Sequence, residues 1–131
     1  MVEETLKRLP EARVYYDCAR QPVLSLVSSM LMAGDEPHIH LEDDCIIDSK
    51  FRERSMEAIE RFPNHIINFF PGMSNRELSE PIMLPGSKFI WLQAVYFPAG
   101  KVGEYYEWGR VNGWHSDSRD GWMNNDQSIM A

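Results

Sequence analysis

The sequence predicts an α/β fold, a three-layer α/β/α sandwich with a mostly parallel or mixed sheet. Two observations predict this class. Segments with helical periodicity alternate along the chain with short apolar segments typical of strands. The chain also has 131 residues, which suffice for one hydrophobic core but not for two domains. We therefore expect residues 1–131 to form a single domain.

Helix and strand signals alternate in the first third of the chain. Residues 2–9 have leucines at helical spacing with acids before bases, and a proline ends this helix. Residues 13–18, RVYYDC, are rich in β-branched and aromatic side chains and indicate a strand that ends at Asp17. Pro22 opens a second helix, and Gly34 suits its end. The apolar stripe of this helix comprises Val23, Val27, Met30 and Leu31.

The middle of the chain carries the next strand, helix and strand. Residues 38–47, HIHLEDDCII, indicate a strand that runs into an acidic cluster. Helical spacing follows in residues 51–62, after Asp48 and Ser49, which favour helix N-termini. Residues 65–70, HIINFF, indicate a third strand.

The last part of the chain is less regular. Proline and glycine residues predict a loop or a hairpin with broken ends in residues 71–87. Residues 88–98 have the longest apolar strand signal, and the lack of polar alternation predicts that both faces of this strand are covered. Residues 105–125 show no clean period. A helix cap at Asn125 or Asp126 predicts a short final helix of about one turn.

The composition excludes several classes of protein. The chain has 13 Lys and Arg against 20 Asp and Glu, a net charge of −7, so we expect no direct binding to nucleic acid. No apolar run approaches the roughly 18 residues of a membrane helix, so we expect no membrane span. The start, MVEETLKRLPEA, lacks the layout of a secretory signal, and Cys18 and Cys45 form no CxxC pair. These features favour the cytoplasm of a bacterium or of a phage-infected host cell.

Three consecutive carboxylates, Glu42, Asp43 and Asp44, follow an apolar strand signal. In an open α/β sheet, ligands bind at the carboxyl ends of the strands. Mg²⁺ and Mn²⁺ prefer oxygen ligands and are usually held by one or two carboxylates together with substrate phosphates. The position of the cluster therefore favours a divalent cation and a phosphorylated ligand over the alternative, a solvated turn or an acidic helix N-terminus.

Three stretches of the chain resemble GT-A-fold glycosyltransferases, especially the lipooligosaccharide-galactosyltransferase-like group. Residues 38–63, HIHLEDDCIIDSKFRERSMEAIERFP, resemble the LEDD segment of that group. Residues 91–98, WLQAVYFP, are similar to its following strand, which precedes a turn and a small helix. Residues 125–129, NDQSI, are similar to its late acidic segment near the acceptor. The three stretches occur in the family order, within residues 13–129.

The resemblance implies transfer of a sugar from a nucleotide-sugar donor, with a UDP-sugar favoured, to a hydroxyl of a saccharide or another acceptor. It implies that Asp44 is a ligand to Mn²⁺ or Mg²⁺, and that Glu42 or Asp43 lies near the ribose or the waters of the metal. A metal at this place neutralises the charge that develops on the leaving diphosphate. An inverting transfer also needs a base for the acceptor hydroxyl, and Asp126 is the position that we predict for it.

Three further side chains are candidates for the same site. His115 takes the place of a late histidine that completes the metal shell in some GT-A enzymes, although a histidine in a loop is more often exposed to solvent. Asp17, at the end of a predicted strand, is placed to meet a uridine or ribose group, and Arg20 a phosphate. For both residues, ordinary turn and cap interactions are an equally good interpretation.

Two alternatives to a glycosyltransferase stay open. GT-A proteins usually begin with a strand, whereas this chain begins with a helix and its end is short. This is compatible with a fragment or minimal variant that lacks the first strand, or with a non-catalytic relic or binding domain that kept the sheet. Alternatively, His38, His40, Glu42 and Asp44 would share one face of a continuous strand and chelate a transition metal in a metal-dependent hydrolase. The simpler interpretation of the two histidines is that they are ordinary strand residues.

Overall fold

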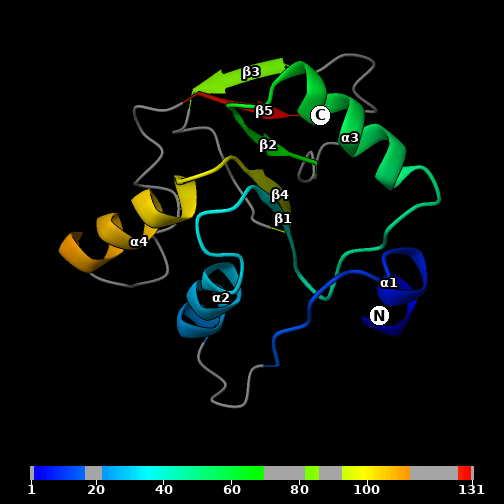
Figure 1. The fold of residues 1–131 in the computed structure, drawn as a ribbon, viewed down its shortest axis with the longest axis horizontal. Coiled ribbons are helices and arrows are strands. Elements are labelled where there is room, and N and C mark those ends of the chain that lie inside the picture. The colour runs from blue at the N-terminus through cyan, green and yellow to red at the C-terminus, as the bar shows by residue number, and fades with distance from the viewer. Residues whose placement is uncertain (1, 17–21, 70–81, 86–92, 113–126, 131) are drawn as a thin grey trace.

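A computed structural model describes residues 2–16, 22–69, 82–85, 93–112 and 127–130, which form helices and strands in a mixed α/β arrangement (Figure 1). In chain order, these elements are α1 (Val2–Arg8), α2 (Pro22–Leu31), β1 (His38–Leu41), α3 (Phe51–Arg61), β2 (Ile66–Asn68), β3 (Ile82–Pro85), β4 (Ala94–Phe97), α4 (Lys101–Asn112) and β5 (Gln127–Met130).

The strands form one sheet in the order β1-β4-β2-β5-β3. The pairs β1–β4, β4–β2 and β5–β3 are antiparallel, and β2–β5 is parallel. The prediction of an α/β class with a mixed sheet is therefore confirmed, whereas a mostly parallel sheet is not found among the described strands. The reason is that apolar patterns along a strand carry no information on the direction of its neighbour.

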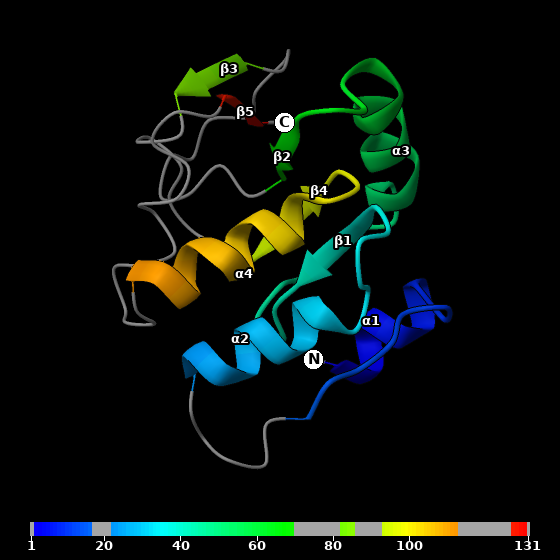
Figure 2. The same cartoon turned by 60° about the vertical axis from the view of Figure 1, so that its left-hand side comes forward.

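Helix α3 packs on one face of the three-stranded part β1-β4-β2. Ala58 of α3, Ile67 of β2 and Tyr96 of β4 form a buried cluster, and partly buried apolar side chains close around it, namely Ile39, Ile59, Phe62 and Phe69. The pairing of Tyr96 with both Ile39 and Ile67 places these three side chains on the same face of the sheet. Helices α2 and α4 contact each other and lie on the other side of β1 and β4 (Figure 2).

Strand β4 is the centre of the core. All four of its residues are buried, and Val95 and Phe97 are fully so. For residues 94–97 this confirms the prediction that both faces of the strand are covered, and residues 88–92 lie outside the described part of the chain.

Several element predictions are confirmed with small changes at their ends. Helices α1, α2 and α3 form where the periodicity predicts them, and Gly34 has the left-handed φ of 61° that a turn after α2 requires. In the stripe of α2, Val27 and Met30 are buried as expected, whereas Leu31 is 46% exposed. Strand β2 lies within the predicted residues 65–70, and β3 lies within the predicted loop or hairpin.

Three element predictions are wrong. Residues 13–16 do not form a strand. They do not pair with β1, which lies at the edge of the described sheet and pairs only with β4. The strand predicted for residues 38–47 ends at Leu41, where the chain turns. The final helix is replaced by β5, since pairing with β2 and β3 outweighs a local cap signal. Helix α4, for which the sequence predicted neither a helix nor a strand by periodicity, follows β4 after a short turn.

Candidate functional site

The predicted acidic cluster forms a turn at the carboxyl end of β1, which we call the acidic turn (residues 42–45). The backbone N–H of Glu42 donates to the carbonyl oxygen of Gln93 at 2.8 Å, and the N–H of Cys45 donates to the carbonyl oxygen of Glu42 at 3.3 Å. The thiol of Cys45 donates to the same Gln93 carbonyl at 2.8 Å. The turn is thereby tied at both ends to the residue that precedes β4.

Cys45 acts in this turn as a neutral hydrogen-bond donor. Burial raises the pKa of its thiol to about 11, and the negative charges of Asp44, Glu42 and Asp43 act in the same direction. Because a thiolate is the reactive form of cysteine, this side chain is suited to structure and not to nucleophilic attack at neutral pH. Asp43 and Asp44 themselves are exposed, whereas Glu42 is half-buried.

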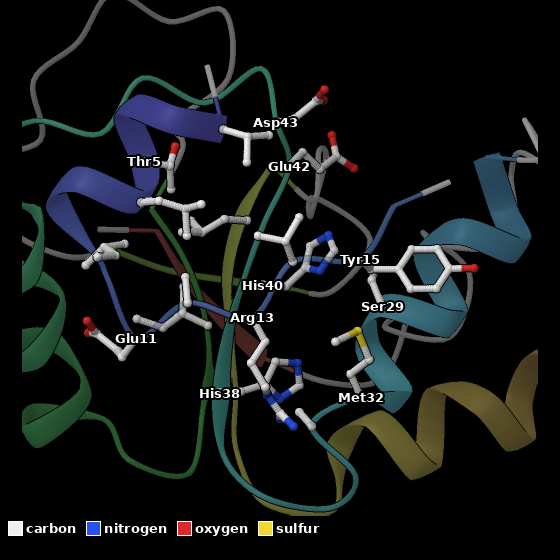
Figure 3. Close-up of a pocket in the computed structure, with 18 of the residues that line it drawn as sticks. Thr5, Glu11, Arg13, Tyr15, Ser29, Met32, His38, His40, Glu42 and Asp43 are labelled. Carbon is white, nitrogen blue, oxygen red and sulfur yellow. The ribbon is translucent and has the colours of Figure 1, made fainter. Parts of the chain in front are cut away.

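A cavity of about 900 Å³ runs along β1 and ends at the acidic turn (Figure 3). We call it the β1 cavity. Its walls come from α1, residues 9–16, the end of α2, all of β1 and the first half of α3. Residues 11–16 are held over it in part by an ion pair between Glu11 and Arg52 of α3. Ligand cavities in proteins commonly measure about 300–1,000 Å³, so this cavity has the size of a small-molecule site.

His38 and His40 project into the β1 cavity from the same face of β1, on the side of α2 (Figure 3). Desolvation by burial lowers the pKa of His40 to about 4, and the neighbouring His38 adds to this effect. Burial also lowers the pKa of His38, opposed by its hydrogen bond to Glu36 and assisted by the charge of Arg13. Both imidazoles are therefore neutral at pH 7.

The structure brings part of the predicted site together. Glu42, Asp43 and Asp44 line the β1 cavity together with the two histidines. Because β1 ends at Leu41, the hypothesis of one continuous strand face with His38, His40, Glu42 and Asp44 is wrong. Within the described residues, no group of three or more His, Cys, Asp and Glu side chains is placed to hold a metal ion. The remaining predicted site residues, Asp17, Arg20, His115 and Asp126, lie outside the described residues.

The acidic turn fits the usual mode of binding for Mn²⁺ or Mg²⁺ when a substrate supplies the other ligands. Such ions commonly take one or two carboxylates from the protein, and phosphates and water complete the shell. Asp43 and Asp44 are adjacent, exposed and at the mouth of a cavity. They therefore offer two carboxylates to a metal that arrives with a phosphorylated ligand.

Sequence reasoning missed two groups at this site. The Gln93 carbonyl anchors the acidic turn from 48 residues away, and a backbone group of this kind leaves no signal in the sequence. Arg13 and Tyr15 line the cavity from a segment that resembled a strand. The arginine and the two tyrosines of that segment were the available signal that it is not a covered strand, because such a strand would carry apolar side chains.

Comparisons with known protein families, with curated proteins and with solved structures found no match for this chain. Among the helices that the structure describes, none is long and apolar enough to span a bilayer. The fold and the site define an α/β domain with a cavity that ends in an acidic turn.

Proposed function

We propose that this chain is a metal-dependent glycosyltransferase of the GT-A type, which moves a sugar from a nucleotide-sugar donor to a hydroxyl of a saccharide or another acceptor. The observation that carries the proposal is the acidic turn at the mouth of the β1 cavity. It combines two exposed carboxylates with a space suited to a ligand of nucleotide size.

The arrangement of the helices supports the same proposal. With α3 on one side of β1 and β4, and α2 and α4 on the other, the described elements are compatible with a three-layer α/β/α sandwich (Figures 1 and 2). In such a fold the carboxyl end of a strand is the expected place for a nucleotide.

The proposal assigns a role to each predicted site residue. Asp44 binds Mn²⁺ or Mg²⁺, with His115 as a further ligand, and a bound metal neutralises charge on the leaving diphosphate. Asp43 and Glu42 orient the ribose or the waters of the metal. Asp17 meets the ribose or the base, and Arg20 a phosphate.

Asp126 is the proposed base that takes the proton of the acceptor hydroxyl. The residue after it, Gln127, opens β5, which runs parallel to β2 with Ser128 opposite Ile66. Through β2 and β4 this register aligns the start of β5 with the start of β1, whereas the acidic turn follows the end of β1. Asp126 itself lies outside the described residues, and the second candidate function, a binding domain without catalysis, needs no base at this position.

Metal-dependent nucleotide binding tests the proposal. Thermal unfolding is measured with UDP, GDP and CDP and their sugars, each with and without Mn²⁺. A ligand at a hundredfold excess over its Kd adds about 2.7 kcal/mol of stability, which shifts the Tm of a domain of this size by several degrees. We expect such a shift with Mn²⁺ present for the wild-type chain and its loss in Asp44→Asn.

The matched control is Glu57→Gln, which removes an exposed acid of α3 outside the β1 cavity and should keep the full shift. Absence of any nucleotide shift in the wild-type chain would contradict the proposal. A shift without sugar transfer to any acceptor, unchanged in Asp126→Asn, would instead identify the non-catalytic binding domain.

A further inference from the structure

His38 and His40 both present a buried, unsatisfied nitrogen in the β1 cavity. The Nε2 atoms of the two rings are shielded from solvent and have no hydrogen-bond partner among the described residues. His40 is only 9% exposed. A buried polar atom without a partner is costly, so two such atoms beside a cavity indicate that a ligand completes them.

The hydrogen bond of His38 determines what its free nitrogen can do. Nδ1 of His38 lies 3.2 Å from the backbone carbonyl oxygen of Glu36. A carbonyl oxygen only accepts, so Nδ1 must carry the proton. In a neutral imidazole the other nitrogen is then a lone-pair acceptor. Nε2 of His38 therefore requires a donor on the ligand, and an anionic oxygen cannot satisfy it.

The surroundings of His38 favour a flat, uncharged ring. Behind it, the imidazole stacks on Phe97 with ring centroids 5.6 Å apart and an angle of 23° between the planes. Across the cavity, Tyr15 and Met32 add apolar surface and are 40% and 37% exposed. Figure 3 shows the side chain of Met32 directed toward the two histidines, whereas the ring of Tyr15 points away from them. Aromatic and apolar walls with few fixed polar groups are typical of a site for a heterocycle.

We propose that His38 and His40 read the base of the donor nucleotide, with Nε2 of His38 accepting a ring N–H, so that the cavity selects uracil or guanine over cytosine or adenine. This inference rests on the proposed function. Uracil carries a proton on N3 and guanine on N1, whereas N3 of cytosine and N1 of adenine are lone pairs. A lone pair opposite Nε2 would leave both atoms unsatisfied.

The geometry of β1 is compatible with this placement. Strands rise by about 3.3 Å per residue, so His38 and the start of the acidic turn at Glu42 are separated by about 13 Å along the chain. A nucleoside with its base at His38 would extend along the strand and carry its diphosphate toward Asp43 and Asp44. The base thus meets the two histidines, and the diphosphate meets the metal-binding end of the same cavity.

The test compares UDP with CDP, which have similar shapes and differ at N3 and the neighbouring exocyclic group. Both are titrated calorimetrically into the full chain with Mn²⁺ present. We expect the wild-type chain to bind UDP at least tenfold more tightly than CDP. A site built to accept a hydrogen bond from the ring N–H rejects a ligand whose ring nitrogen carries a lone pair instead. In His38→Phe, which keeps an aromatic ring against Phe97, the UDP affinity should fall about tenfold or more, and the preference should disappear.

The matched control is His65→Gln, because His65 also carries a buried nitrogen without a described partner but does not line the β1 cavity. It should keep the preference for UDP. Equal binding of UDP and CDP by the wild-type chain would overturn the assignment of His38 and leave the proposed function standing. Absence of binding by any nucleotide would overturn both.

A second measurement needs no substitution. Nitrogen NMR of the free chain at pH 7 reports which imidazole nitrogen of His38 carries the proton. We expect a proton on Nδ1 and a free Nε2, whose resonance shifts on addition of UDP. A proton on Nε2 in the free chain would overturn the inference whatever the nucleotide titrations show.

Discussion

His40 couples the stability of the chain to pH. Burial lowers its pKa to about 4 from an ordinary value of 6.5, so between these values the unfolded chain binds a proton that the folded chain does not. The extra proton stabilises the unfolded state. The full stability is therefore present above pH 6.5 and is lost as the pH falls toward 4.

Protonation of His40 should lower the free energy of unfolding by about 2 to 3 kcal/mol between pH 7 and pH 4.5. Urea unfolding at the two pH values measures this loss. His40→Gln removes the titrating group and should flatten this part of the profile. An equally steep profile in the variant would show that other groups control it. His38, whose pKa is lowered in the same direction, adds a smaller contribution.

At the scale of elements, α4 shows how a helix forms without an apolar period. Its first turn is fixed from outside, since the N–H of Gly100 donates to the carbonyl oxygen of Asp35 at 3.0 Å. A side chain at Gly103 would place Cβ 3.1 Å from Oδ1 of Asp35. Gly103 therefore allows α4 to approach the turn that follows α2, and this contact leaves no pattern in the sequence.

Substitution of these glycines should have opposite effects. Gly103 lies within a helix, where alanine is preferred by about 1 kcal/mol, and the exposed carboxylate of Asp35 can rotate away. Gly103→Ala should therefore raise the free energy of unfolding by up to about 1 kcal/mol. Gly100 has a φ of 80°, so Gly100→Ala should lower it by about 1 to 2 kcal/mol. Denaturant unfolding measures the free energy of unfolding of both variants. A decrease in both would show that the Asp35 side chain does not rotate away from the new Cβ.

The acidic turn is likewise a property of two elements and not of β1 alone. A continuous alternating pattern through residues 38–44 predicted one strand face, but the Gln93 carbonyl draws both Glu42 and Cys45 toward β4. Local propensity favoured a longer strand, but the turn closed by the hydrogen bond from the N–H of Cys45 to the carbonyl oxygen of Glu42 ends it.

At the scale of the whole molecule, α3 and the sheet share one core. Ile67 is fully buried between Ala58 and Tyr96, and the hydroxyl of Tyr96 donates to the carbonyl oxygen of Pro63 at the end of α3 at 3.0 Å. Loss of packing here affects the helix and the strands together, because Ala58, Ile67 and Tyr96 belong to one buried cluster.

Ile67→Ala should lower the free energy of unfolding by about 2 to 5 kcal/mol, as expected for truncation of a fully buried side chain. Ile46 is 90% exposed, so the same substitution there should change it by less than about 0.5 kcal/mol. Chemical denaturation of the two variants measures the difference. Similar effects at both positions would contradict the core described above.

The sequence by itself determined the α/β class, the positions of α1, α2 and α3, the buried strand β4 and the acidic cluster after β1. These follow from periodicity and from residue preferences, which are local. Only the tertiary structure decided the order β1-β4-β2-β5-β3, the end of β1 at Leu41 and the meeting of the histidines with the acidic turn in one cavity. Each of these depends on contacts between distant residues, as between Glu42 and Gln93, and such contacts leave no pattern along a single chain.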